Sequence, residues 1–161
     1  TRKTSPGLRV LERYGVRAGG GTNHRFGLFD AILIKDNHLK IAGGVKPALL
    51  AAEKFLKAHP HLQMSQILSV EVSNLDELQE ALDLGAKRVL LDNMSPDQVR
   101  QCIQKISISS SNGNSEYFVE VSGGITLENL SGYLISGVNA ISTGSLTHSA
   151  RNVDLSLEFT D

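Results

Sequence analysis

Residues 67–92 read ILSVEVSNLDELQEALDLGAKRVLLD, and this stretch decides the fold of the chain. Its first run, Ile67–Val72, is apolar and rich in β-branched residues, which predicts a buried strand. The leucines of 75–82 then share one helical face, and Asn74 before them is typical of an N-cap, with a glutamate three residues later. The next apolar run, Val89–Leu91, predicts a second strand. A strand, a helix and a strand in this order indicate a βαβ unit with parallel strands.

The same alternation continues on both sides of this unit. Further strands are predicted at 31–34, 117–121 and 140–142, and helices at 6–14, 49–56, 96–106 and 127–134. We expect Leu8 and Leu11 to face inward, Gly15 to end the first helix, and the leucines of the last helix to be buried. The serine-rich stretch 109–115 is typical of a surface turn. Strict alternation of strands and helices implies a parallel sheet with right-handed crossovers.

The length of the chain limits which α/β architecture is possible. It has 161 residues, whereas a closed eightfold (β/α) barrel needs about 250. We therefore expect a TIM-like, parallel-stranded, open or incomplete (β/α) barrel that forms a single domain over residues 1–161. The chain begins with Thr1 and its first methionine is Met64, so we expect it to start inside a longer gene product.

The composition excludes several classes of protein. A net charge of −1, from 16 basic and 17 acidic residues, argues against a general binder of nucleic acids or membrane surfaces. The one cysteine, Cys102, excludes an internal disulfide framework and a multi-cysteine zinc site, and its apolar helical stripe predicts a core position. Because no stretch approaches the ~18 apolar residues of a membrane span and no signal peptide is recognisable, we expect a cytoplasmic protein.

Residues capable of chemistry occur at the ends of all five predicted strands. Lys35 follows the first strand, Glu71 lies near the end of the second, and Asp92 follows the third. Ser122-Gly123-Gly124 follow the fourth strand, and Thr143-Gly144-Ser145 follow the fifth. Ligands of parallel α/β folds bind at the carboxyl ends of the strands, so we expect these groups to converge on one site.

The residue types at these ends favour an anionic small molecule. Glycines before a helix let backbone amides approach a phosphate, although they could also only make tight turns. A lysine at the end of an apolar strand is costly unless it meets an anion, although its ammonium could also extend into solvent. Further cations gather in glycine- or turn-rich stretches, namely Arg2, Lys3, His24 and Arg25. In a nearly neutral chain, such a cluster indicates a polyanionic small molecule rather than a polymer.

Glu71 and Asp92 are predicted to be carboxylates on neighbouring strands. Such a pair could hold Mg²⁺ beside phosphates, bind ribose hydroxyls, or act as acid and base. The alternative, which carries less weight, is that the two residues are ion-pair partners of the basic cluster.

Six short motifs occur in a fixed order along the chain. They are Thr1-Arg2-Lys3-Thr4-Ser5-Pro6-Gly7, Asn23-His24-Arg25, Ile34-Lys35-Asp36-Asn37-His38, Val70-Glu71-Val72, Leu91-Asp92-Asn93 and Ser122-Gly123-Gly124-Ile125. Together they resemble the quinolinate phosphoribosyltransferase family, also called nicotinate-nucleotide pyrophosphorylase (carboxylating), over essentially the whole chain. The resemblance implies a transferase of NAD biosynthesis that uses Mg²⁺. Such an enzyme converts quinolinate and phosphoribosyl pyrophosphate into nicotinate mononucleotide, pyrophosphate and CO2.

The resemblance also implies roles for individual residues. Quinolinate would be bound by Arg2, Lys3, His24, Arg25 and Lys35. Glu71 and Asp92 would face the ribose hydroxyls and the metal, directly or through water or substrate, and the 5′-phosphate would be held by Ser122, Gly123, Gly124 and Gly144. The residues expected to be catalytic are Lys3, Lys35, Glu71 and Asp92, and either lysine could position the departing carboxylate.

The resemblance further implies parts beyond this chain. Family members resemble two-domain proteins, with an N-terminal α/β sandwich domain before an open barrel, and they act as dimers whose sites borrow an arginine from the partner. We therefore expect a C-terminal fragment without the sandwich domain and the first barrel strand, and no competent enzyme from these residues alone. We expect the full-length protein to be a homodimer or a higher oligomer.

Three other interpretations remain open from the sequence. One is a related barrel phosphoribosyltransferase with another nitrogen-base acceptor, such as the molybdenum-operon homologues. Another is a phosphate-binding fragment without catalysis. The third is an aldolase-like barrel in which Lys35 forms a Schiff base, which the motifs around Arg2 and His24 disfavour.

Overall fold

The computed structural model describes residues 3–60, 68–113, 116–150 and 153–159, with the backbone alone for 111–113. Residue contacts divide the chain into two compact units. The sheet unit is Arg25–Thr143, and the terminal unit is Thr1–His24 together with Gly144–Asp161. The expectation of a single barrel domain stays a prediction.

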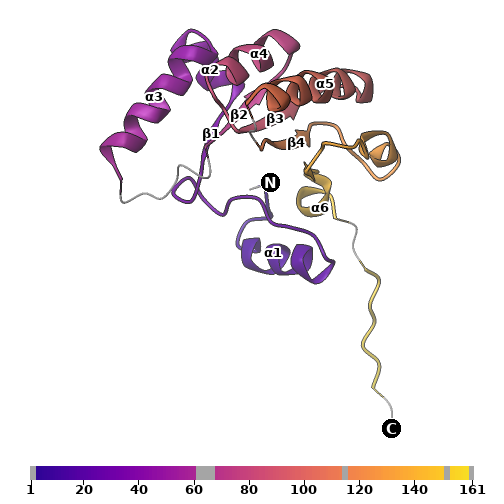
Figure 1. Ribbon diagram of the computed structural model, residues 1–161. Helices are drawn as coiled ribbons and strands as arrows, with labels where there is room; N and C mark the ends of the chain where they lie inside the picture. The colour runs from indigo at the N-terminus through magenta and orange to yellow at the C-terminus, as the bar shows by residue number, and fades with distance from the viewer. Residues whose placement is uncertain (1–2, 61–67, 114–115, 151–152, 160–161) are drawn as a thin grey trace. The chain divides into compact units, whose positions relative to one another are not determined.

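The sheet unit is built on a parallel sheet with five strands in the described part of the chain, in the order β1-β2-β3-β4-β5. The strands are β1 (Ile32–Ile34), β2 (Leu68–Val72), β3 (Arg88–Asp92), β4 (Phe118–Ser122) and β5 (Ala140–Ile141). Each strand lies beside its neighbour in sequence, so the sheet winds in one direction, as barrel walls do and doubly wound sheets do not (Figure 1). The predicted open, parallel-stranded α/β fold is confirmed.

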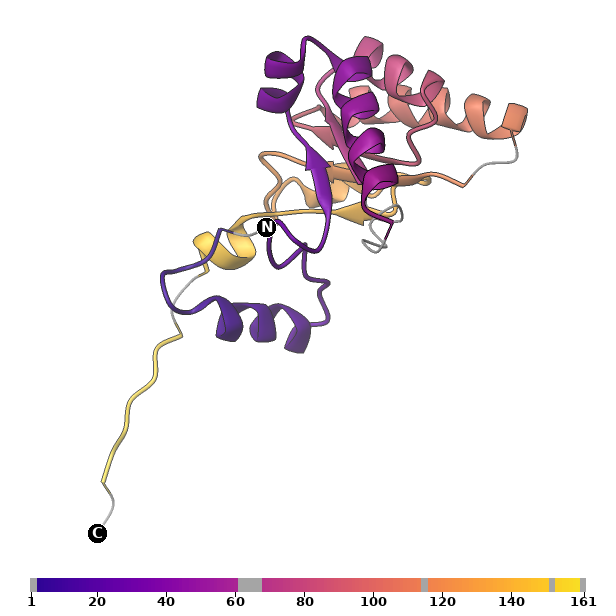
Figure 2. The same cartoon turned by 90° about the vertical axis from the view of Figure 1, so that its left-hand side faces the viewer.

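Helices follow the strands and cover one side of this sheet. They are α2 (Asp36–Ala42), α3 (Val45–Ala58), α4 (Leu75–Asp83) and α5 (Pro96–Gly113). Helix α4 packs against both α3 and α5, which places the three long helices in one layer (Figure 2). The core lies between this layer and the sheet, where Val70, Leu78 and Val99 are almost completely buried. Cys102 is fully buried there too, which confirms its predicted core position.

The two faces of the sheet differ in chemistry because side chains alternate along a strand. Val72, Leu91 and Val121 are in register with one another and belong to the core. The residues one position earlier in β2 and β4 are glutamates, Glu71 and Glu120, and both are in register with Leu90 of β3. The face away from the helices therefore carries polar groups, and it is the wall on which a site can be built.

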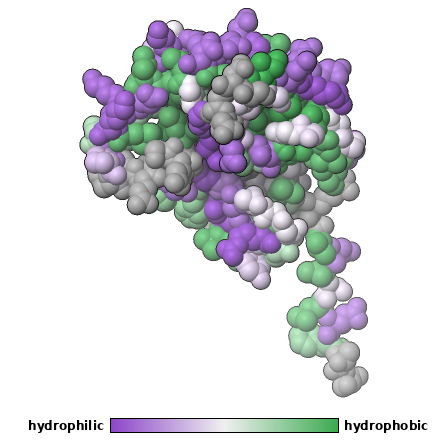
Figure 3. Space-filling model, in the orientation of Figure 1, coloured by the Kyte–Doolittle hydropathy of each residue, from purple (hydrophilic) through white to green (hydrophobic). Residues whose placement is uncertain are grey.

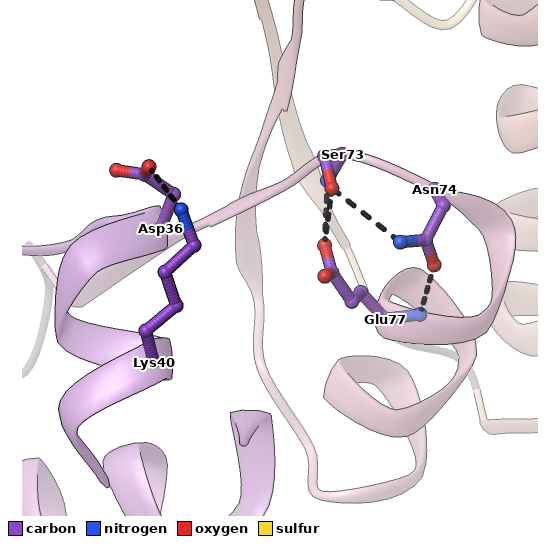
Figure 4. A network of polar contacts seen from close by, with 5 residues as sticks. All are labelled: Asp36, Lys40, Ser73, Asn74 and Glu77. Atoms are coloured by element: carbon purple, nitrogen blue, oxygen red, sulfur yellow. Dashed lines mark hydrogen bonds and ion pairs between the residues drawn. The ribbon is translucent and has the colours of Figure 1, made fainter. Parts of the chain in front are cut away.

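Helix α4 begins at the predicted cap. Asn74 accepts hydrogen bonds from the backbone amides of Asp76 and Glu77 at 3.1 and 2.9 Å. The carboxylate of Glu77 in turn accepts from the backbone amide and the hydroxyl of Ser73, at 2.7 and 2.9 Å (Figure 4). The N-cap prediction is confirmed, with the glutamate holding the residue before the cap instead of the cap itself.

Helix α2 has no counterpart among the predicted elements. It starts directly after β1, where the Lys35 amide donates to Nδ1 of His38 at 2.9 Å. Asp36 and Lys40 form an ion pair of 3.4 Å along its surface (Figure 4), and Gly43 ends it with φ +88°. A seven-residue helix held by its ends carries too short an apolar stripe to be recognised from periodicity.

Two predicted elements of the sheet unit are wrong. The helix expected at 127–134 is a single 3-10 turn, η2 (Leu130–Tyr133), and Leu127 and Leu134 are 86% and 72% exposed instead of buried. The serine-rich stretch expected to be a turn continues helix α5 as far as Gly113. Ser109 and Ser110 donate to carbonyls one helical turn earlier, those of Lys105 and Ile106, at 3.3 and 3.0 Å, so these hydroxyls do not interrupt the helix.

The terminal unit holds helices α1 (Arg9–Ala18) and α6 (Ser145–His148). Helix α1 begins later than expected and runs past Gly15, so the prediction that this glycine ends the helix is wrong. The expectation that Leu8 and Leu11 face inward is also wrong, since the two residues are 47% and 66% exposed. Segment 153–159 is irregular, and its apolar side chains are exposed (Figure 3). In the part of the chain that the structure describes, no helix is long and apolar enough to cross a membrane.

Candidate functional site

The strand-end site of the sheet unit is centred on an ion pair between β1 and β2. Nζ of Lys35 lies 3.0 Å from Oε2 of Glu71. The register of β1 and β2 aligns Ile34 with Val70, so the residues that follow them lie side by side at the same end of the sheet. The Glu71 side chain is 8% exposed and that of Lys35 is 48% exposed. The glutamate is therefore a buried anion whose cationic partner remains open to a ligand.

Asp92 ends β3 and belongs to the same electrostatic group. Burial raises its pKa, and the negative charge of Glu71 raises it further, while the ammonium of Lys35 acts in the opposite direction. The ionised form of Asp92 is thus disfavoured by its surroundings. A cation placed beside these two carboxylates would be stabilised by both. The predicted neighbourhood of Glu71 and Asp92 is therefore present in the structure.

The Ser122–Gly124 loop packs directly against the residue after Asp92. The Asn93 amide donates to the carbonyl oxygen of Ser122 at 2.8 Å, and Asn93 itself has a positive φ of 56°. Gly123 has φ +94°, and a Cβ at this position would lie 2.6 Å from the Asn93 nitrogen. The close approach of two backbones therefore requires glycine, which places Ser122 and Gly123 beside the Asp92 strand end.

The segment after β5 is hydrogen-bonded to the segment after β4. The hydroxyl of Thr143 donates to the carbonyl oxygen of Ile125 at 2.8 Å. One residue earlier, the hydroxyl of Ser142 donates to Glu120 at 2.5 Å on the polar face. These contacts hold the carboxyl ends of β4 and β5 together. Sequence reasoning assigned no such tie to Thr143 or Ser142, although hydroxyl residues directly after a strand are the available signal.

Arg25 is the other predicted substrate-binding cation of the sheet unit. Its Nη1 donates to the carbonyl oxygen of Ala31 at 2.9 Å, just before β1. Asp30 accepts from the amides of Phe26 and Gly27 at 2.6 and 3.0 Å, and these hydrogen bonds lower its pKa against the opposing effect of desolvation. The turn that carries Arg25 is therefore closed by polar contacts ahead of β1.

The terminal unit carries Lys3, His24 and Gly144. The carbonyl oxygen of Lys3 accepts a hydrogen bond of 2.7 Å from the hydroxyl of Thr147. The carbonyl oxygen of His24 accepts one of 2.7 Å from Arg13 of α1. Arg2 lies outside the described residues. The convergence of these residues with those of the sheet unit stays a prediction.

A protein-family model matches almost the whole chain. The model for the C-terminal domain of quinolinate phosphoribosyl transferase matches residues 1–158. The chain belongs to the quinolinate phosphoribosyltransferase family. This confirms the resemblance drawn from the six motifs.

Curated relatives in this family carry closely related names. A probable nicotinate-nucleotide pyrophosphorylase (carboxylating) of Bacillus subtilis is 45% identical over 160 residues, which cover 99% of this chain and 51% of the relative. One from Methanocaldococcus jannaschii is 42% identical and is covered to 53%. The chloroplastic enzyme of Arabidopsis thaliana is 40% identical and is covered to 47%. The chain thus spans about half the length of the curated relatives that it matches.

Solved structures of the family agree with the fold. The crystal structure of NadC from Streptococcus pyogenes is 40% identical and superposes with a TM-score of 0.83, covering 99% of this chain and 51% of that one. The nicotinate-nucleotide pyrophosphorylase from Francisella tularensis gives a TM-score of 0.72 at 41% identity, covering 92% of this chain and 48% of that one. Membership of the quinolinate phosphoribosyltransferase family therefore rests on sequence and on structure alike.

Proposed function

We propose that this chain supplies the phosphoribosyl-transfer site of a quinolinate phosphoribosyltransferase. The reaction joins quinolinate to phosphoribosyl pyrophosphate and releases pyrophosphate and CO2, which leaves nicotinate mononucleotide. The observation that carries the proposal is the group formed by Lys35, Glu71 and Asp92 at neighbouring strand ends. It combines a ligand-accessible cation with two carboxylates whose like charges repel each other. The chain that carries this group belongs to the corresponding family.

The two carboxylates suit the first chemical step. The bond between ribose C1 and the pyrophosphate oxygen breaks, and positive charge develops on the ribose ring. Glu71 and Asp92 stabilise that charge electrostatically, and their burial strengthens the effect because the local dielectric is low. The ring nitrogen of quinolinate then forms the new bond to C1.

Lys35 suits the recognition of a dicarboxylate. Its ammonium has three N–H donors, one of which points to Glu71, and its side chain is half exposed. Arg25 and the cations of the terminal unit are proposed as the further contacts. Once the ring nitrogen carries the ribose, the C–C bond to the neighbouring carboxylate breaks, the ring takes up the electron pair, and a proton replaces the lost CO2. Lys3 and Lys35 are the two candidates for positioning that carboxylate.

The donor set fits a magnesium ion that arrives with the substrate. In the described part of the chain, no three histidine, cysteine or acidic residues form a group that could hold a metal alone. Mg²⁺ commonly takes one or two carboxylates together with substrate phosphates and water, which matches Glu71 and Asp92. When bound, the ion neutralises the leaving pyrophosphate.

The phosphate group of the ribose is proposed to bind at the glycine loops. Gly123 and Gly124 both have positive φ beside Asn93, and a glycine has no side chain of its own to shield its backbone. Such backbone can approach an oxyanion closely. Gly144 of the terminal unit is proposed as a second contact. A cytoplasmic full-length protein that is a homodimer or a higher oligomer is part of the same proposal, and light scattering of the full-length protein tests its oligomeric state.

Titrations with quinolinate and nicotinate test the proposed acceptor. We expect the 161-residue chain to bind quinolinate about tenfold more tightly, because nicotinate lacks the second carboxylate that a cation would pair. Lys35→Ala should remove this preference and leave phosphoribosyl pyrophosphate binding intact. Lys40→Ala is the matched control, since that exposed lysine pairs with Asp36 on the surface of α2. Equal affinities for quinolinate and nicotinate would instead indicate another nitrogen-base acceptor.

Turnover is measured in the same samples as formation of nicotinate mononucleotide. We expect binding without robust turnover from these 161 residues, because the chain spans about half the length of its relatives. Loss of phosphoribosyl pyrophosphate binding in Lys35→Ala, together with loss of quinolinate binding, would show that the lysine supports the whole site rather than the acceptor.

A further inference from the structure

A buried hydroxyl joins the two ends of the terminal unit. Thr147 is 8% exposed, and its Oγ1 donates to the carbonyl oxygen of Lys3 at 2.7 Å, across 144 positions of sequence. We propose that Thr147 is a positioning residue that fixes the backbone of Lys3, so that the lysine ammonium is presented to a carboxylate of quinolinate. This inference rests on the proposed function, and it assigns to Thr147 no contact with the substrate.

Of the two carbonyl oxygens near the Thr147 hydroxyl, that of Lys3 is the better acceptor. The carbonyl oxygen of Gly144 lies 3.2 Å from the same Oγ1, which is 0.5 Å farther than that of Lys3. The Gly144 carbonyl already accepts the backbone amides of Thr147 and His148 at 3.1 and 3.0 Å. Because a hydroxyl donates one proton, the shorter bond to Lys3 is the one that it makes.

The residues after Lys3 are tied to a different element. The Ser5 amide donates to the carboxylate of Glu12 at 3.1 Å, and Nε of Arg9 donates to the hydroxyl of Thr4 at 3.3 Å. Helix α1 therefore holds the residues on one side of Lys3, while α6 holds the carbonyl of Lys3 itself. These hydrogen bonds fix the carbonyl side of this exposed lysine and so define the point from which its side chain extends.

Fixing the backbone lowers the entropy lost when the ammonium meets a carboxylate. Without the Thr147 hydroxyl, the Lys3 carbonyl loses a hydrogen bond and the lysine backbone is free to move. Ligand binding must then order this backbone, and the entropy lost in doing so lowers the affinity. A hydrogen bond of this kind corresponds to about a tenfold change in a binding constant. We therefore expect Thr147→Val to weaken quinolinate binding about tenfold, because valine keeps the shape and removes the donor.

The test is a double-mutant cycle on the 161-residue chain, with quinolinate affinity measured by NMR titration. The variants are Thr147→Val, Lys3→Ala and the two combined, with Thr147→Ser as the conservative rescue. If Thr147 acts through Lys3, the double variant binds no more weakly than Lys3→Ala alone, and serine restores the wild-type affinity. A change in the carbonyl carbon shift of Lys3 in Thr147→Val, but not in Thr147→Ser, reports the bond directly.

Two negative results have different meanings. Additive effects of the two substitutions, or full affinity in Thr147→Val, would overturn the role of Thr147 while leaving quinolinate recognition in place. The wild-type chain could bind no quinolinate while Thr147→Val still changes the Lys3 carbonyl shift. That result would overturn the proposed function and with it this use of the hydrogen bond. Alanine at position 3 keeps the backbone carbonyl, so Thr147→Val should lower the melting temperature equally with and without Lys3→Ala. A merely structural threonine would show this loss of stability without the coupling in quinolinate affinity.

Discussion

Gly123→Ala separates two reasons for a glycine at the end of β4. At φ +94° an alanine is strained, which by itself costs about 1–2 kcal/mol. Its Cβ would also lie 2.6 Å from the nitrogen and 2.8 Å from the Cα of Asn93, and backbone atoms cannot rotate away. Overpacking of this kind adds about 1–3 kcal/mol. We expect a total loss of about 2–5 kcal/mol in the free energy of unfolding.

Gly85→Ala is the matched control within the same unit. Gly85 has a similar φ of +81°, and among the described residues no atom lies within 4 Å of the Cβ that alanine would add. Only the conformational part of the penalty applies there, about 1–2 kcal/mol. The difference between the two variants in free energy of unfolding therefore measures the cost of the contact with Asn93.

Urea unfolding followed by circular dichroism measures both variants. With a typical dependence of about 1–3 kcal/mol per molar urea, the midpoint of Gly123→Ala should lie about 1 M below that of Gly85→Ala. The Gly123 variant should also lose affinity for phosphoribosyl pyrophosphate, whereas the Gly85 variant should keep it. Equal midpoints and equal affinities would refute the close approach between the Ser122–Gly124 loop and Asn93.

Three further changes test the electrostatics and the local structure. Burial and the charge of Glu71 raise the folded-state pKa of Asp92. The free energy of unfolding therefore falls as pH rises through that pKa. Asp92→Asn should therefore raise the melting temperature at pH 7, lose that gain below the unfolded value of 3.8, and abolish phosphoribosyl pyrophosphate binding. Lys35→Ala leaves Glu71 without its ion-pair partner and should lower stability by about 1 kcal/mol in thermal melts, since the lysine is half exposed. Asn74→Ala should lower the urea-derived stability by about 1 kcal/mol, and an unchanged midpoint would argue against its capping role.

Periodicity predicted the sheet unit wherever an apolar stripe faces the core. The helix with Leu78 and the strands with Val70 and Val89 were found because their apolar spacing coincides with a stripe that the core covers. Leu127 and Leu134 have the same spacing but face solvent, because the chain there makes only one 3-10 turn before β5. The period is a necessary sign of a buried helix but not a sufficient one, since packing partners decide whether the stripe is covered.

The site was predictable at the level of strand ends. Lys35, Glu71 and Asp92 follow from the rule that parallel strands present their last residues at one edge. The ion pair of 3.0 Å does not follow, because it depends on the register of β1 with β2. The ties of Asn93 to Ser122 and of Thr147 to Lys3 join residues far apart in sequence, so neither was accessible to reasoning about local patterns.

The alternation of core and polar residues within each strand affects how the family can change. In β2, Glu71 lies between Val70 and Val72, so a residue of the wall and residues of the core are immediate neighbours in sequence. Substitutions on the polar face can alter ligand preference while the core stays intact. A deletion or insertion of one residue within the strand would exchange the two faces, placing a glutamate in the core and a valine in the site. These strands should therefore tolerate exchange of side chains during evolution but resist any change in their length.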